Sequence, residues 1–153
     1  MTTYVDSSAL VAVYVTEAFS HAARAAVRAA GQVPFTAIHR LEVPNAFEML
    51  VGRELITREQ CRAVNGHLQE DIEDQRLVTV SLDFDRVFAD ATELSRLYTA
   101  RLLARSLDLL HVAAARVIEC QRFVSADDRQ LAVAKAIGLK AVDIKRRART
   151  KKS

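Results

Sequence analysis

Four acidic residues stand in the sequence where an apolar run ends or where their neighbours are apolar. Asp6 follows the run "TYV", and Asp127 comes shortly after "RFVS". Glu42 in "RLEVPNA" and Asp108 in "SLDLLHVAAA" lie near the starts of predicted helices. Carboxylates that gather in one place repel one another, which raises their pKa values unless a cation compensates the charge. The four acids are therefore candidates for a shared cation site.

Mg²⁺ or Mn²⁺ is the cation that suits such a site, because both ions are hard and prefer oxygen ligands. The sequence has no cluster of cysteines or histidines that would suggest zinc. A carboxylate-held Mg²⁺ commonly serves phosphodiester hydrolysis, where it activates water and neutralises charge on the leaving oxygen. Glycine-rich phosphate loops and the nucleophile elbow of serine hydrolases are missing from the sequence.

Each acid also has an ordinary structural explanation. Asp6 and Asp127 are good helix N-caps. Asp108 suits the positive end of a helix dipole, and Glu42 could lie on a solvent-exposed helix face. A shared site is favoured only because all four recur at the same kind of place, where a strand leads into a helix.

Strands and helices alternate along the chain. Helices long enough to cross between parallel strands imply a parallel sheet covered by helices on both faces, an α/β sandwich. Ligands of such sheets bind beyond the carboxyl ends of the strands. We expect strands at 3–5, 33–35, 76–80, 122–125 and 140–144, and helices at 7–15, 20–30, 37–54, 57–74, 83–101, 106–120 and 126–138.

Local signals set some helix boundaries. Thr57 and Gln60 match a capping box, and Ser106 is a candidate cap for the helix that contains Asp108. Pro44 lacks an N–H group and should kink or locally break the helix around it.

The composition indicates one domain and a basic end. Of 153 residues, half are apolar, which is enough for a core. The last nine residues, "KRRARTKKS", carry six Lys or Arg and no acid, and residues 1–144 carry a net charge of −3. We expect a folded domain at 1–144 and a disordered tail at 145–153 that either binds nucleic acid or is simply solvated. Cys61 and Cys120 are expected to be free thiols.

No secretory signal and no run of about 20 apolar residues is visible, so we expect a cytoplasmic protein. Two segments, "LVAVYVTEAF" and "FEMLVGREL", hold more apolar residues than one core face needs. They are candidates for a dimer surface or for a groove that binds a partner peptide.

The sequence resembles the PIN-domain family, and within it the VapC-type ribonuclease toxins of type II toxin–antitoxin (VapBC) systems. The matching stretches are "YVDSSALV", "LEVPNA", "ARSLDLLHVAAA" and "FVSADDRQLAVAKAIGLKAV", in the family's order and at about its spacing. The resemblance covers residues 3–144. It implies a three-layer α/β/α sandwich with a parallel sheet of strand order 3-2-1-4-5.

The resemblance also assigns roles to residues. It implies that the catalytic and metal-binding acids are Asp6, Glu42, Asp108 and Asp127, with Ser7, Ser125 and Arg105 close to the metal.

Three further residues leave alternatives open. Asp128 falls at a variable position of the family, and we interpret it as a helix-start residue rather than a ligand. Asp90 is a minor alternative acid on a helix face. His111 is either a packed, hydrogen-bonded helix residue or a group that reaches the site and contacts the metal ligands without binding the metal itself.

The function implied by the resemblance is a Mg²⁺- or Mn²⁺-dependent endoribonuclease that acts on RNA as a toxin. It further implies a cognate VapB-type antitoxin and a homodimer. Two alternatives remain: a PIN-domain nuclease of RNA processing without an antitoxin, and a non-catalytic module that binds nucleic acid.

Overall fold

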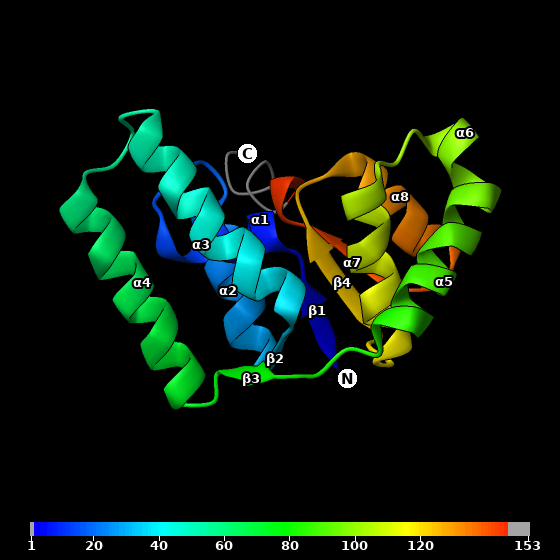
Figure 1. Ribbon diagram of the computed structural model, residues 1–153, viewed down its shortest axis with the longest axis horizontal. Coiled ribbons are helices and arrows are strands. Elements are labelled where there is room, and N and C mark those ends of the chain that lie inside the picture. Colours follow the sequence, from blue (N-terminus) through cyan, green and yellow to red (C-terminus); the bar gives the residue numbers. More distant parts are fainter. Residues whose placement is uncertain (1, 147–153) are drawn as a thin grey trace.

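A computed structural model describes residues 2–146 as short parallel strands surrounded by helices (Figure 1). The strands are β1 (Thr3–Val5), β2 (Val33–Phe35), β3 (Leu77–Thr79), β4 (Arg122–Ser125) and β5 (Lys140–Asp143). The α-helices are α1 (Ser7–Tyr14), α2 (Ser20–Ala30), α3 (Ala37–Gly52), α4 (Arg58–Glu73), α5 (Phe84–Leu94), α6 (Ala100–Leu102), α7 (Ser106–Val117) and α8 (Asp128–Ala136), and a π-helical segment, η1 (Ser95–Thr99), joins α5 to α6.

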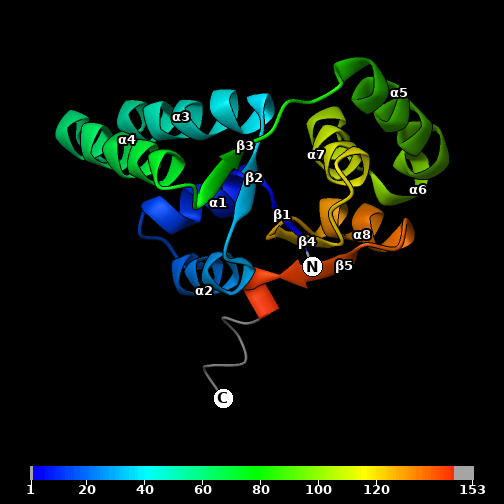
Figure 2. The same ribbon diagram turned by 90° about the horizontal axis from the view of Figure 1, so that it is seen from below.

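All strand pairs are parallel, as predicted. Hydrogen-bonded ladders join β1 to β4, β4 to β5, and β2 to β3. Strands β2 and β1 lie side by side without a ladder between them, which completes the strand order 3-2-1-4-5 (Figure 2). The expected α/β sandwich is therefore confirmed, with a break in its hydrogen bonding at the centre.

The sheet separates two hydrophobic cores. Side chains alternate between the two faces of a strand, so Tyr4 and Val5 of β1 enter different cores, as do Phe123 and Val124 of β4. Val5 and Val124 pack with α1, α2, α3 and α4, whereas Tyr4 and Phe123 pack with α5, α7 and α8. The two helix groups lie on opposite sides of the strands in Figure 1.

The predicted helices form, with ends that shift by up to three residues and with three larger differences. Ser106 is the first residue of α7 and not its cap: Arg105 occupies the N-cap position, and Asp108 three residues on accepts its N–H group at 3.1 Å. Pro44 does not break α3, which continues through it. The helix expected at 83–101 is α-helical over α5 and changes to a π-helix at η1, a rare local variant of the helix that apolar spacing alone does not predict.

The capping box predicted at Thr57 and Gln60 is confirmed: Gln60 N–H donates to Thr57 Oγ1 at 3.0 Å and Thr57 N–H to Gln60 Oε1 at 2.8 Å. Cys61 and Cys120 are buried free thiols, as expected.

The C-terminal end is described only in part. Of the predicted basic tail, residues 147–153 lie outside the described residues. Lys145 is held by Asp128 at 2.9 Å and by Asp143 at 3.4 Å. Within residues 2–146, no helix is both long and apolar enough to cross a membrane.

Candidate active site

A pocket of about 460 Å³ lies beyond the carboxyl ends of β1 and β4. All four predicted acids line it, although they come from four separate parts of the chain. The full lining is Asp6, Ser7, Ser8, Glu42, Arg105, Ser106, Leu107, Asp108, His111, Asp127 and Gln130. The fold therefore gathers the predicted acids in one place, as the strand-end argument expects.

Asp6 is the most buried acid of the pocket. It is the N-cap of α1, where its Oδ1 accepts the Ala9 N–H at 2.9 Å and its Oδ2 accepts the Ser8 hydroxyl at 2.8 Å. Burial raises the pKa of Asp6, and the nearby His111 and these hydrogen bonds oppose the rise only in part. A buried carboxylate of this kind is stabilised in its charged form by a nearby cation.

Asp127 is fixed by the start of α8. Its Oδ1 accepts the N–H groups of Arg129 at 2.9 Å and Gln130 at 3.0 Å, so it is an N-cap as well as a pocket residue. Ser125 lies fully buried behind it: its hydroxyl accepts the Asp127 N–H at 3.0 Å and donates to Gln130 Oε1 at 2.8 Å. Ser125 thus supports the loop that carries Asp127.

Asp108 and Arg105 are neighbours in the first turn of α7. One carboxylate oxygen of Asp108 accepts the backbone N–H of Arg105, and the guanidinium Nε of Arg105 lies 3.9 Å from that oxygen. The Arg105 side chain is 74% exposed, whereas that of Asp108 is 16% exposed. The pocket therefore has a solvated cation at its edge, next to a mostly buried carboxylate.

Glu42 reaches the pocket from α3 and is held by two side chains. Its Oε1 accepts the Ser7 hydroxyl at 2.9 Å and is hydrogen-bonded to Nε2 of His111. Burial alone would raise the pKa of Glu42, but the hydrogen bond and charge of His111, helped by Ser7, lower it overall. His111 is thus buried and hydrogen-bonded, and one of its partners is Glu42, a lining residue of this pocket.

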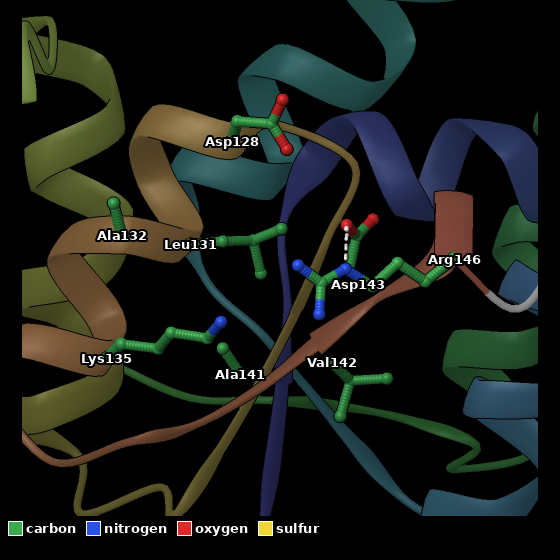
Figure 3. Close-up of a pocket in the computed structure, with 8 residues that line it drawn as sticks. All are labelled: Asp128, Leu131, Ala132, Lys135, Ala141, Val142, Asp143 and Arg146. Carbon is green, nitrogen blue, oxygen red and sulfur yellow. Dashed lines mark ion pairs between the residues drawn. The ribbon is translucent and has the colours of Figure 1, made fainter.

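The remaining two acids lie elsewhere. Asp128 lines a different pocket of about 410 Å³ between α8 and β5, where Asp143 and Arg146 form an ion pair at 3.8 Å (Figure 3). Its side chain is 83% exposed and pairs with Lys145, which agrees with a helix-start residue. Asp90 binds the Arg116 guanidinium through both oxygens, at 3.0 and 2.6 Å.

The donor set suits a hard divalent cation. Four carboxylates line one pocket, and the most buried of them has a raised pKa. Within residues 2–146, however, no three acidic, histidine or cysteine side chains stand close enough together to share one ion. Separation is the arrangement expected of carboxylates that repel one another, and each is instead held by its own hydrogen bonds.

Sequence reasoning did not identify three residues whose side chains hydrogen-bond to residues of this pocket or to Ser125 behind it: Tyr4, Ser8 and Gln130. Gln130 had a usable signal, because Asp127 and Gln130 have the spacing of a capping box. Ser8 follows Asp6 by two residues, a common position for a local side-chain hydrogen bond. Tyr4 carries no local signal, because its hydroxyl partner is His111, 107 residues away.

Comparison with known proteins finds a matching family model and solved structures of similar fold. The family model of the PIN domain matches residues 3–136. Among solved structures, FitAcB from Neisseria gonorrhoeae is similar at a TM-score of 0.66 and 13% identity, covering 94% of this chain and 98% of that chain. PAE2754 from Pyrobaculum aerophilum is similar at a TM-score of 0.60 and 18% identity, covering 98% and 94%. A search of curated proteins found no significant match.

Proposed function

Because the chain belongs to the PIN domain family, whose members are generally metal-dependent nucleases, we propose that it is a Mg²⁺- or Mn²⁺-dependent endoribonuclease. The observation that carries the proposal is the convergence of Asp6, Glu42, Asp108 and Asp127 on one pocket at the strand ends. All four positions keep an acid, which favours a catalytic protein over a non-catalytic nucleic-acid-binding module.

The four acids would hold the cation, which when bound supplies Lewis-acid stabilisation of the scissile phosphate and activation of water. Asp6 and Asp127 are fixed in place as N-caps, so little side-chain freedom remains to be lost on binding. Both ring nitrogens of His111 are occupied, by Tyr4 and by Glu42. His111 is therefore a poor candidate for the general base, and a carboxylate or the metal centre itself would take the proton released during hydrolysis.

We propose that Arg105 binds the RNA backbone. Its guanidinium is exposed at the pocket edge, and its carboxylate neighbour Asp108 lies too far away for a tight hydrogen bond. A planar guanidinium binds phosphate through two parallel hydrogen bonds.

The biological role we propose is that of a VapC-type toxin neutralised by a VapB-type antitoxin, acting as a homodimer. Exposed apolar side chains support a partner surface: Leu107 lines the pocket, and Met49 and Leu55 lie in the apolar segment "FEMLVGREL". A nuclease of RNA processing without an antitoxin would share the same site.

Cleavage of an end-labelled RNA pool tests the activity. Purified protein is incubated with Mg²⁺, with Mn²⁺ or with a chelator, beside Asp6→Asn and the matched control Asp128→Asn. The expected result is cleavage at discrete sites that needs the metal, is lost in Asp6→Asn and persists in Asp128→Asn. Cleavage that survives in Asp6→Asn would contradict the proposed site.

A further inference from the structure

Tyr4, His111 and Glu42 form one continuous chain of hydrogen bonds across the domain. The Tyr4 hydroxyl lies 2.6 Å from Nδ1 of His111, and Nε2 of the same ring bonds to Glu42 Oε1. Ser7 donates to the same Glu42 oxygen at 2.9 Å. The chain joins β1, α7 and α3, which are brought together only by the tertiary fold.

The proton positions in this chain follow from its two ends. An ionised Glu42 only accepts hydrogen bonds, so Nε2 of His111 must carry a hydrogen and donate it. The Tyr4 ring packs against the rings of Phe123, His39 and His111, and its hydroxyl then donates to Nδ1 of His111. The Tyr4 hydroxyl, both ring nitrogens of His111 and Oε1 of Glu42 each have a partner, and the imidazole is held in one orientation.

A serine–histidine–carboxylate triad is excluded by the same geometry. Ser7 and Glu42 both approach Nε2 of His111, with Ser7 Oγ at 3.3 Å, while Nδ1 faces Tyr4. In a triad the carboxylate and the serine bind opposite nitrogens of the ring. The histidine therefore holds Glu42 and does not activate Ser7.

We propose that His111, fixed by Tyr4, is a positioning residue that aims Glu42 at the divalent cation, an inference that rests on the proposed function. Both protein contacts of Glu42 use Oε1, and among residues 2–146 no hydrogen bond to Oε2 is formed. Oε2 is thus the oxygen left for the cation. Glutamate has three side-chain torsions, so an unheld Glu42 would have to lose more rotamer freedom on binding.

Metal binding, measured apart from cleavage, tests this role. Titration calorimetry with Mn²⁺ alone is run on the full chain and on His111→Leu, His111→Gln, Tyr4→Phe and the control Asp128→Asn. His111→Leu removes the donor to Glu42, and its Mn²⁺ affinity should fall about 10- to 100-fold, the usual cost of losing such a supporting hydrogen bond. His111→Gln restores an N–H donor and should recover part of the affinity. Asp128→Asn should bind as the unchanged chain does.

Tyr4→Phe keeps the ring packing and removes only the hydroxyl. It should weaken Mn²⁺ binding about 10-fold, the lower end of the same range. This variant carries the test if thermal unfolding shows that His111→Leu does not fold.

The Glu42→Gln background separates positioning from a general structural effect. If His111 acts through Glu42, adding His111→Leu to Glu42→Gln should lower Mn²⁺ affinity by less than about twofold. An equal loss in both backgrounds would overturn the inference while leaving the nuclease intact. Absence of Mn²⁺ binding to the unchanged chain would instead overturn the proposed function itself.

Discussion

His39 of α3 donates a hydrogen bond of 2.8 Å from Nε2 to the backbone carbonyl of Val5 in β1. In a strand, the N–H and C=O of one residue point the same way and successive residues alternate. The N–H of Asp6 bonds to Val124 of β4, so the Val5 carbonyl faces β2. A side chain therefore satisfies the carbonyl that a β2–β1 ladder would use, and the sheet stays continuous in space without that ladder.

This relationship predicts a pH-dependent stability. Nδ1 of His39 accepts the Thr36 N–H at 3.0 Å, so the ring is neutral, and burial together with the nearby His111 lowers the pKa of His39 to about 3. The unfolded chain binds a proton at the ordinary histidine pKa of about 6.5, so stability is lost as pH falls below that value. We expect this residue to cost about 2 kcal/mol of unfolding free energy between pH 7 and pH 5.

Urea unfolding of the unchanged chain and of His39→Gln at both pH values measures this cost. Glutamine retains an N–H donor and does not titrate, so the pH dependence of this variant should be smaller by about the same 2 kcal/mol. The other titrating groups of the pocket are shared by both proteins and cancel in the difference. Equal pH dependence in the two proteins would refute the assignment.

The sequence predicts which acids line the candidate site better than it predicts the hydrogen bonds that hold these acids in place. Asp6 and Asp127 follow strands, and parallel strands place their carboxyl ends at one edge, so their proximity follows from local patterns. The contact of Tyr4 with His111 depends on how α7 packs against β1, and no local spacing encodes it.

Competition between local signals explains why the prediction of Ser106 as the N-cap of α7 is wrong. Ser106 is a good N-cap residue, yet the carboxylate of Asp108 accepts the Arg105 N–H and fixes the start of α7 one residue earlier. The missing β2–β1 ladder was equally beyond sequence reasoning, because it depends on the side chain of His39.

Asp6→Asn should separate stability from metal binding. Burial raises the pKa of Asp6 in the folded state, so the metal-free protein loses stability as pH rises from about 3.9 through that raised value. Asparagine is neutral and an equally good N-cap. We expect metal-free Asp6→Asn to be more stable than the unchanged chain at pH 7, with a higher Tm.

Differential scanning calorimetry with and without Mn²⁺ checks this expectation. The unchanged chain should gain Tm with Mn²⁺, as any ligand of the folded state requires, and Asp6→Asn should not. Asp83→Asn is the matched control, because Asp83 caps α5 at an exposed position and accepts the Arg86 N–H at 3.2 Å. A lower Tm for metal-free Asp6→Asn would contradict the view that burial destabilises the charged form of Asp6.

Asp127 and Asp128 are adjacent acids with different surroundings. Asp127 lines the pocket of the four acids, whereas Asp128 lines the pocket beside β5 (Figure 3). Asp127→Asn keeps the cap of α8 and should lower the initial rate of RNA cleavage at least about 10-fold through loss of a cation ligand. Asp128→Asn removes the negative charge that pairs with Lys145 at the surface and should leave the rate within about twofold. The opposite order of effects would move the active site to the neighbouring pocket.

Arg105 should contribute to RNA affinity through charge. Its exposed guanidinium at the pocket edge is expected to neutralise one phosphate, so Arg105→Ala should weaken binding of single-stranded RNA and lower the salt slope of log K by about 0.7. Fluorescence anisotropy over a salt series measures both, in the Asp6→Asn background to prevent cleavage. Arg105→Lys should keep the slope, and Arg101→Ala, whose guanidinium lies 5.8 Å from the Tyr98 ring centre, should change neither. A slope unchanged in Arg105→Ala would remove Arg105 from the RNA-binding surface.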